Sequence, residues 1–234
     1  MSLRRAAGTV AAIALGVGAG VAAAILIADV LDTLSSPPQS SSSLQERADA
    51  LQLERIAREV ISPLASSSEK PIVVIDMIDD ARVSATIARE LPRHRIVTEV
   101  ANEARRHENS AVPARSGARN ATASVSSDGA GIGAPGAAVI VLVDSYNSVG
   151  GGTSTDRVQW LRHLLQRGRL CRGGHVVIIE AVPGAIPVPA PPLGQRLERS
   201  TVIAEAEDAG LNLVDAPGFL RWHSALVFKL PLDE

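Results

Sequence analysis

The sequence is poor in cysteine and in aromatic residues, and each shortage argues against a class of function. Cys171 is the only cysteine among the 234 residues, so neither an internal disulfide nor a thiolate metal cluster is possible. Aromatic residues make up 2% of the chain, too few for the stacking platforms that bind single-stranded nucleic acid. The formal net charge of −2 gives no reason to expect a nucleic-acid partner either. The histidines are scattered without the spacing of metal ligands, so we expect no metal site.

What the sequence does have, first of all, is a long apolar run near its N-terminus. Residues 6–28 contain Thr9 as their only clearly polar side chain, and about 20 such residues suffice for a helix to cross a bilayer. Arg4 and Arg5 precede the run and Asp29 follows it, so the positive-inside rule predicts an N-terminus on the cytoplasmic or matrix side. The alternative is a cleaved signal peptide, whose apolar region would be shorter, about 7–15 residues.

We therefore expect a single-pass membrane protein, in the mitochondrial inner membrane of a eukaryote or otherwise in a bacterial inner membrane. Gly16 and Gly20 lie four residues apart on one helix face, a pattern typical of helix contacts between membrane-protein subunits. A second candidate contact with a partner is the stiff Pro-rich loop 182–192, for which the alternative is a plain rigid crossover.

Composition divides the chain into three parts. Residues 1–34 are the expected transmembrane anchor, and residues 35–70 begin with a Ser/Pro-rich linker. Within that second part, residues 44–64 place apolar side chains at helical spacing, which predicts an amphipathic helix. Residues 71–234 form the expected globular domain.

From Pro71 onward, strand-like runs alternate with helical patterns. Val139–Val143 and Val176–Ile179 are apolar throughout, as is typical of parallel strands covered by helices on both faces. The connection 216–223 is too short for a crossover helix, so the last two strands should form an antiparallel hairpin. We expect an α/β fold with a doubly wound, mostly parallel seven-stranded sheet. The expected strands are Ile72–Asp76, Arg95–Val100, Thr122–Val125, Ala137–Asp144, His175–Ala181, Leu211–Asp215 and Ser224–Lys229, and the expected helices are Asp79–Leu91, Ala101–His107, Thr155–Leu170 and Arg199–Ala209.

The C-terminal half resembles the class I S-adenosylmethionine-dependent methyltransferases. The likeness lies in a strand with an acidic–aromatic turn, the helix after it, a glycine-led fifth strand, and a closing helix and hairpin. These segments are Val141–Asn147, Asp156–Leu165, Gly173–Glu180, Ala206–Leu211 and Phe219–Phe228. The resemblance covers residues 72–229 and implies the Rossmann-like methyltransferase fold.

The resemblance also implies four candidate cofactor-binding residues. Asp76 falls at or beside the acidic position after the first strand, and Glu99 ends the second strand, where the family's acidic residue holds the ribose hydroxyls. Asp144 and Tyr146 follow a central strand, where open α/β sheets place their ligands. Two alternatives remain open: Glu99 as a helix-start acid, and Tyr146 as a structural side chain over the sheet edge.

The departures from the family predict that these four residues are vestigial. Met77, Ile78, Asp79 and Asp80 stand where the family has a glycine-rich loop, and their side chains would fill the space of an adenosyl group. We therefore expect no cofactor and no catalytic residue, in an accessory or scaffold subunit of a larger membrane complex. The alternative is an active, membrane-tethered methyltransferase that uses S-adenosylmethionine.

Overall fold

A computed structural model describes residues 49, 51–66, 68–76, 81–100, 117–125, 136–184 and 191–232. Contacts within the chain divide it into two units, Met1–Ser40 and Ser41–Glu234, and the fold described below is that of the second. The apolar run 6–28, the expected helix Ala101–His107 and the turn 77–80 lie outside the described residues. In the described parts of the chain, no helix combines the length and the hydropathy needed to span a bilayer.

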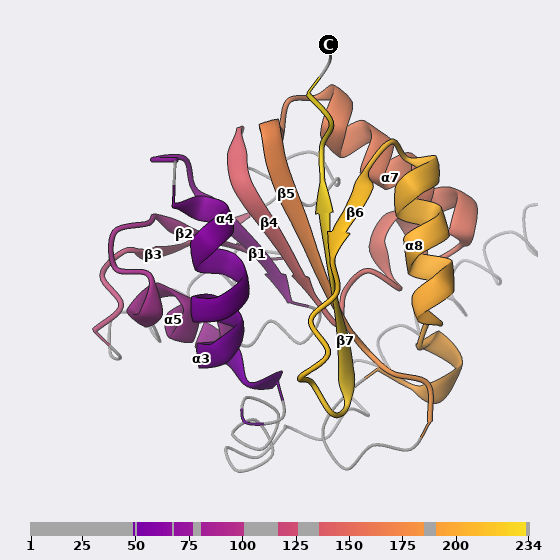
Figure 1. The fold of residues 1–234 in the computed structure, drawn as a ribbon, viewed down its shortest axis with the longest axis horizontal. Coiled ribbons are helices and arrows are strands. Elements are labelled where there is room, and N and C mark those ends of the chain that lie inside the picture. The colour runs from indigo at the N-terminus through magenta and orange to yellow at the C-terminus, as the bar shows by residue number, and fades with distance from the viewer. Residues whose placement is uncertain are drawn as a thin grey trace, which may run out of the picture. The chain divides into compact units, whose positions relative to one another are not determined.

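Seven strands form one sheet in the order β3-β2-β1-β4-β5-β7-β6 (Figure 1). The strands β1 to β5 pair in parallel, whereas β7 lies antiparallel between β5 and β6. Their bounds are β1 Ile72–Asp76, β2 Ile96–Val100, β3 Ala121–Val125, β4 Ala137–Val143, β5 Leu170–Ala181, β6 Asn212–Asp215 and β7 His223–Lys229. The predicted doubly wound α/β sheet with its antiparallel C-terminal hairpin is confirmed.

The start of β5 differs from the sequence prediction. The expected helix runs to Leu170, but α7 (Ser154–Gln166) ends four residues earlier and Leu170 already pairs with Ala137 of β4. The reason lies at Gly168, whose φ of 63° is left-handed and directs the chain back towards the sheet.

Helices cover both faces of the sheet, as Figure 1 shows. A helical segment made of α3 (Leu53–Arg55), a π-helical turn η1 (Ile56–Ile61) and α4 (Ser62–Ala65) packs on one face together with α5 (Ala81–Glu90). The other face carries α7 and α8 (Arg199–Asp208).

The strand β4 shows why the sheet needs both layers. Val139 and Val141 point into the cluster under α5, whereas Ile140 and Leu142 point into the cluster under α7 and α8. All seven β4 side chains are buried, so the continuous apolar run in the sequence is the consequence of a strand with two covered faces. The amphipathic helix that we expected in residues 44–64 packs into the cluster under α5, where Leu51 is fully buried.

Truncation of Leu142 to alanine should test this two-sided packing. The side chain is fully buried, so we expect Leu142→Ala to lower the free energy of unfolding by about 2–5 kcal/mol. Val214→Ala on the edge strand β6, where the side chain is 50% exposed, should change it by about 0.5 kcal/mol at most. Urea unfolding of both variants measures the difference, and equal effects would contradict the assigned layers.

Candidate functional site

The carboxyl ends of β1 and β4 lie side by side in the middle of the sheet. The chain leaves β1 towards α5 on one face and leaves β4 towards α7 on the other. In open α/β sheets, ligands bind at such a point, because the two diverging connections leave a crevice between them. The residues at these strand ends therefore define the candidate site.

Asp76 and Glu99 end neighbouring strands, and both are nearly buried, at 3% and 4% exposure. Glu99 pairs with Ile75 in register, so the two carboxylates stand one residue apart along the strand direction. Because side chains alternate across a strand, Asp76 lies on the α5 face with Val74, and Glu99 lies on the opposite face with Ile75. The structure thus brings these two predicted residues to the same edge of the sheet, on either side of it.

The turn after β4 is bound to both neighbouring strands. Asp144 has a left-handed backbone with φ of 49°, which aspartate tolerates better than most residues. Its main-chain N–H donates to the Ile179 carbonyl at 2.8 Å, and its Oδ1 accepts from the Ala181 N–H at 3.1 Å. On the other side, Ser145 Oγ donates to the Ile75 carbonyl of β1 at 3.2 Å. The turn therefore holds the ends of β1, β4 and β5 together.

Glu180, near the end of β5, is hydrogen-bonded to this turn. Its Oε1 accepts from the Tyr146 N–H at 2.6 Å, and the side chain is buried at 2% exposure. Burial, followed by the negative charge of Asp144, raises the pKa of Glu180 to about 8, against the opposing effect of the main-chain donors of the turn. Glu180 is therefore mostly protonated at neutral pH, so it adds little charge beside Asp144.

Tyr146 points away from the strand ends of β1 and β2. Its hydroxyl donates to Glu205 Oε2 of α8 at 3.0 Å, and Arg157 of α7 donates to both Glu205 oxygens at 2.8 and 2.6 Å. Burial alone would raise the pKa of Glu205, but the hydrogen bonds from Arg157, Ser154 and Tyr146 lower it overall. These contacts tie α7 to α8 and match the structural alternative for Tyr146, while cofactor binding by any of the four predicted residues stays a prediction.

Sequence reasoning missed His223, the first residue of β7. Its side chain is fully buried, and its Nε2 lies 3.4 Å from Asp144 Oδ1. Within the described parts of the chain, neither ring nitrogen makes a hydrogen bond. The antiparallel pairing of β7 with β5 sets His223 opposite Ala181. The predicted strand began at Ser224 and the prediction gave no register for it, so it held no signal that would place His223 beside the β4 turn.

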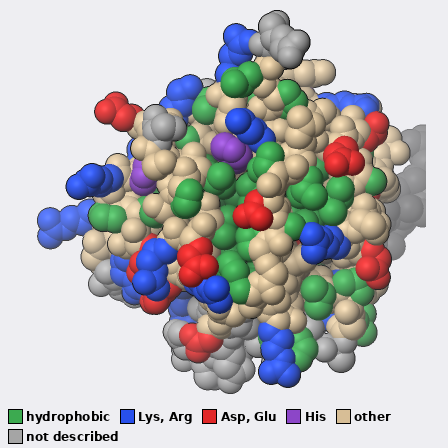
Figure 2. Space-filling view, in the orientation of Figure 1, with side chains coloured by type: hydrophobic (Ala, Val, Ile, Leu, Met, Phe, Trp, Pro, Cys, Tyr) green, Lys and Arg blue, Asp and Glu red, His purple; other side chains and the backbone are tan. Residues whose placement is uncertain are grey.

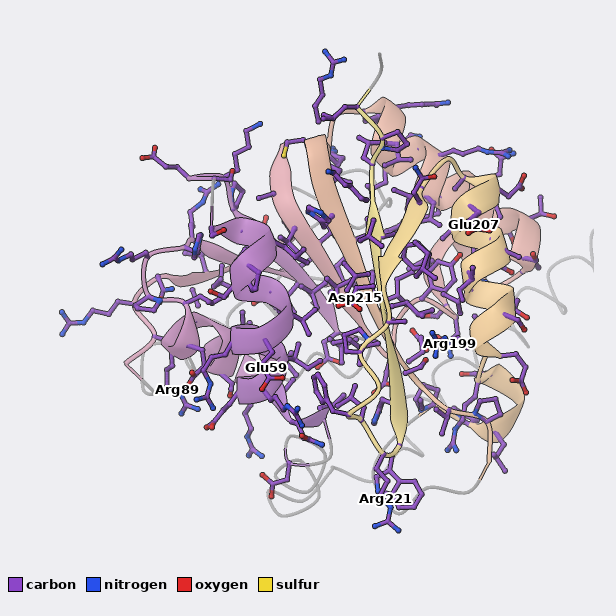
Figure 3. The ribbon with its side chains drawn as sticks, in the orientation of Figure 1. Glu59, Arg89, Arg199, Glu207, Asp215 and Arg221 are labelled. Atoms are coloured by element: carbon purple, nitrogen blue, oxygen red, sulfur yellow. The ribbon has the colours of Figure 1, made fainter. Side chains whose placement is uncertain are left out.

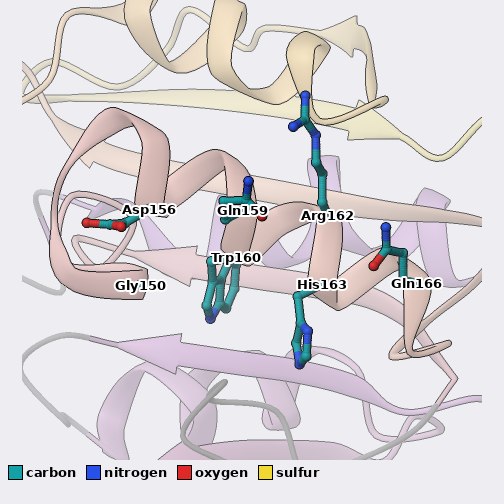
Figure 4. Close-up of a pocket in the computed structure, with 7 residues that line it drawn as sticks. All are labelled: Gly150, Asp156, Gln159, Trp160, Arg162, His163 and Gln166. Carbon is teal, nitrogen blue, oxygen red and sulfur yellow. The ribbon is translucent and has the colours of Figure 1, made fainter.

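A separate cavity of about 320 Å³ lies on the flank of α7 (Figure 4). Trp160 and His163 point into the same space from successive helical turns, and Gly150 and Asp156 close one end. Gly150 has φ of 69°, and a Cβ there would lie 2.5 Å from the Asp156 carbonyl oxygen, so this turn requires glycine. All lining residues come from α7 and the turn before it, so no residue at the strand ends lines this cavity.

By sequence, the chain matches no protein-family model and no curated protein. By structure, it is similar to a SAM-dependent methyltransferase from Aquifex aeolicus, with a TM-score of 0.63 and 12% identity over 83% of this chain and 100% of that one. The magnesium protoporphyrin IX methyltransferase of Synechocystis, with bound SAH, gives 0.56 and 12% over 87% and 94%. The cyclase SpnF gives 0.58 and 11% over 77% and 82%.

These neighbours show that the chain has the class I methyltransferase-like fold. They also correct the expectation that the chain uses no cofactor, because neighbours with this fold include SAM-dependent enzymes and one with bound SAH. That expectation rested mainly on the missing glycines at 77–80. Residues other than glycine still present main-chain N–H groups, so the composition of a turn does not by itself exclude a ligand.

The protonation of Glu180 gives a measurable pH dependence. Because its folded pKa of about 8 lies above the ordinary value, its contribution to stability is complete at low pH and declines as the pH rises towards 8. We expect Glu180→Gln to remove this decline, whose slope is at most about 1.4 kcal/mol per pH unit. Urea unfolding from pH 5 to 9 measures it as the difference between the two proteins, and parallel curves would contradict a protonated Glu180.

Proposed function

We propose that the domain is an S-adenosylmethionine-dependent methyltransferase. The fold supports this proposal, as do neighbours that carry out this reaction or hold SAH. The observation that carries it is the buried pair Asp76 and Glu99 at the carboxyl ends of adjacent strands, next to the point where the chain leaves β1 and β4 towards opposite faces of the sheet.

The chemistry of these residues fits the cofactor. A carboxylate accepts hydrogen bonds from two adjacent hydroxyls, which suits Glu99 to a ribose diol, and Asp76 offers an acceptor for an amino group. When bound, S-adenosylmethionine supplies an electrophilic methyl group on a sulfonium centre. The protein's own task is then mainly to position the reactants, so few catalytic side chains are needed.

The turn 144–147 meets the requirement for positioning. Its main-chain and side-chain hydrogen bonds reach β1, β5 and the segment before α8, where Asn147 Nδ2 donates to the Gln195 carbonyl at 3.0 Å. A site built on three fixed strand ends holds its geometry better than one built on a free loop. Because Glu180 is mostly protonated at neutral pH, it places no second negative charge beside Asp144 at the base of the candidate site.

Binding of SAH should stabilise the full chain, because a ligand that binds only the folded state shifts unfolding by mass action. At 100 times the dissociation constant the gain is about 2.7 kcal/mol. For a chain of this size that is a rise of about 5–10 °C in melting temperature. We expect Glu99→Ala to abolish most of the rise, as measured by thermal unfolding with and without SAH in mild detergent.

The matched control is Glu207→Ala, which removes an exposed carboxylate from α8 (Figure 3). This variant should respond to SAH like the unaltered chain. A folded chain whose melting temperature does not move with millimolar SAH, and which shows no heat of binding, would overturn the proposed function.

We propose, from the sequence alone, that residues 6–28 tether this domain to a membrane. Gly16 and Gly20 and the loop 182–192 are the proposed contacts with partner subunits, and residues 185–190 of that loop lie outside the described residues.

Figure 2 shows positive and negative side chains interspersed over the face in view, so that face offers no broad patch of one charge.

Extraction at alkaline pH separates an anchored chain from a peripheral one. We expect the full chain to stay with the membrane pellet after a carbonate wash, because a spanning helix is released only by detergent. A variant with Val17 and Ala23 both replaced by arginine should move to the supernatant, since charges at the bilayer centre are costly. Release of the unaltered chain by carbonate would contradict the anchor.

A further inference from the structure

The connection between β6 and β7 places apolar and cationic side chains together at the carboxyl edge of the sheet. Residues 217–222, which we call the 217–222 tip, read Pro-Gly-Phe-Leu-Arg-Trp. Arg221 projects outward from this connection (Figure 3), and its guanidinium carbon lies 4.5 Å from the centre of the Trp222 ring. Tryptophan beside arginine is typical of protein surfaces that meet the membrane–water interface.

Trp222 is not explained by the packing of the core. It is half-buried, yet neither of the two apolar clusters formed by the described residues includes it. Phe219 and Leu220 of the same tip do pack against the cluster under α5, so they anchor the connection. An indole combines a large apolar ring with a polar N–H, and it is therefore well suited to a place where hydrocarbon and water meet.

The tip is held in a fixed form by the rest of the domain. The Trp222 carbonyl accepts from the Val182 N–H, just after β5, at 3.0 Å. Gln52 Nε2 donates to the Phe219 carbonyl at 3.2 Å, and the guanidinium carbon of Arg55 lies 4.1 Å from the centre of the Phe219 ring. A surface that is ordered before contact loses little conformational entropy on binding.

The same contacts show where the chain enters this unit. Gln52 precedes α3 and Arg55 lies within it, so the first helix of the described fold contacts the tip. In the sequence, residues 29–50 separate this point from the apolar run 6–28. A flexible chain of that length spans about 25 Å, so the proposed tether leaves the tip within reach of the membrane surface.

The charge at the tip suits an anionic surface. Arg221 is exposed, and within the described residues it takes part in no ion pair. The nearest acid in the sequence is Asp215, whose Oδ1 accepts from the Ala216 N–H at 2.7 Å at the base of the connection. An exposed arginine near anionic lipid strengthens binding about fivefold.

We propose that the 217–222 tip is a membrane-contact surface, which seats the Trp222 ring at the headgroup level of a phospholipid bilayer and presents Arg221 to anionic lipid. This inference rests on the proposed membrane tether and is independent of the methyltransferase reaction. The tether keeps the tip at a roughly millimolar effective concentration near the bilayer, so a contact of a few side chains suffices. The contact turns the carboxyl edge of the sheet, which carries the candidate site, towards the membrane.

Tryptophan fluorescence tests this contact directly, because Trp160 and Trp222 are the only tryptophans in the chain. We expect the full chain with Trp160→Phe, reconstituted in vesicles of phosphatidylcholine and phosphatidylglycerol, to lose emission when brominated phosphatidylcholine is included. Bromine quenches only at close range, so the loss reports Trp222 against lipid. Trp222→Phe is the matched control, since Trp160 is only 8% exposed on α7 and should keep its emission.

A second probe covers the case that Trp160→Phe does not fold. Gly218→Cys in a Cys171→Ser background accepts a fluorophore whose emission rises in an apolar medium, and a Cβ at Gly218 would meet no atom within 4 Å. We expect this emission to rise on reconstitution. The same label at Glu207→Cys, at an exposed position of α8, should not respond.

The role of charge has its own pair of variants. Arg221→Glu should reduce the quenching on these vesicles, because it replaces attraction to phosphatidylglycerol with repulsion. Arg93→Glu changes an exposed arginine before β2, at the amino edge of the sheet, and should leave the quenching as it is. Equal effects of the two variants would overturn the part assigned to Arg221.

Flotation of the same vesicles separates this proposal from the tether. A chain that floats with the vesicles while Trp222 keeps its full emission overturns the membrane contact and leaves the tether standing. A label at position 218 that brightens in cell membranes and not in vesicles of pure lipid assigns the tip to a protein partner and also overturns the contact. A chain that does not float overturns the tether and the contact together, while the response to SAH tests the methyltransferase function separately.

Discussion

The structure depends on one polar turn set into an apolar sheet, residues 144–147 after β4. The amide and carboxylate of Asp144 extend the pairing of β4 with β5, and Ser145 reaches back to β1. In a doubly wound sheet the chain must leave the central strands β1 and β4 towards opposite faces, which would let the ends of these two strands separate. The hydrogen bonds of the turn hold that edge in a fixed form, and the candidate site is built upon it.

Burial gives this turn its chemical character as well as its rigidity. Asp144, Glu180 and His223 are all nearly inaccessible, and two carboxylates so close to each other cannot both be charged cheaply. Glu180 holds a proton at neutral pH and so avoids the second charge. Asp144 Oδ1 lies 3.4 Å from Nε2 of His223. Tyr146 of the same turn donates to Glu205 of α8, and Arg157 of α7 donates to that carboxylate as well. The turn therefore both positions the candidate site and ties α7 to α8.

The fold was predictable because its signals are local. The apolar runs of β4 and β5 and the short connection before β7 suffice to predict a parallel sheet with an antiparallel hairpin. The site was predictable only in part, because Asp76 and Glu99 end strands, whereas His223 is 79 positions from Asp144 in the sequence and meets it only through strand pairing. The expectation of no cofactor failed because it treated four side chains at 77–80 as decisive.

The proposed function requires that the carboxyl ends of β1 and β2 hold S-adenosylmethionine. Photo-crosslinking of the radiolabelled cofactor to the full chain, followed by proteolysis and peptide mapping, tests it most directly. We expect label in the peptides that contain residues 72–82 or 96–105, and we expect unlabelled SAH to compete for it. Label confined to the α7 flank around Trp160, or label that SAH does not displace, would contradict it.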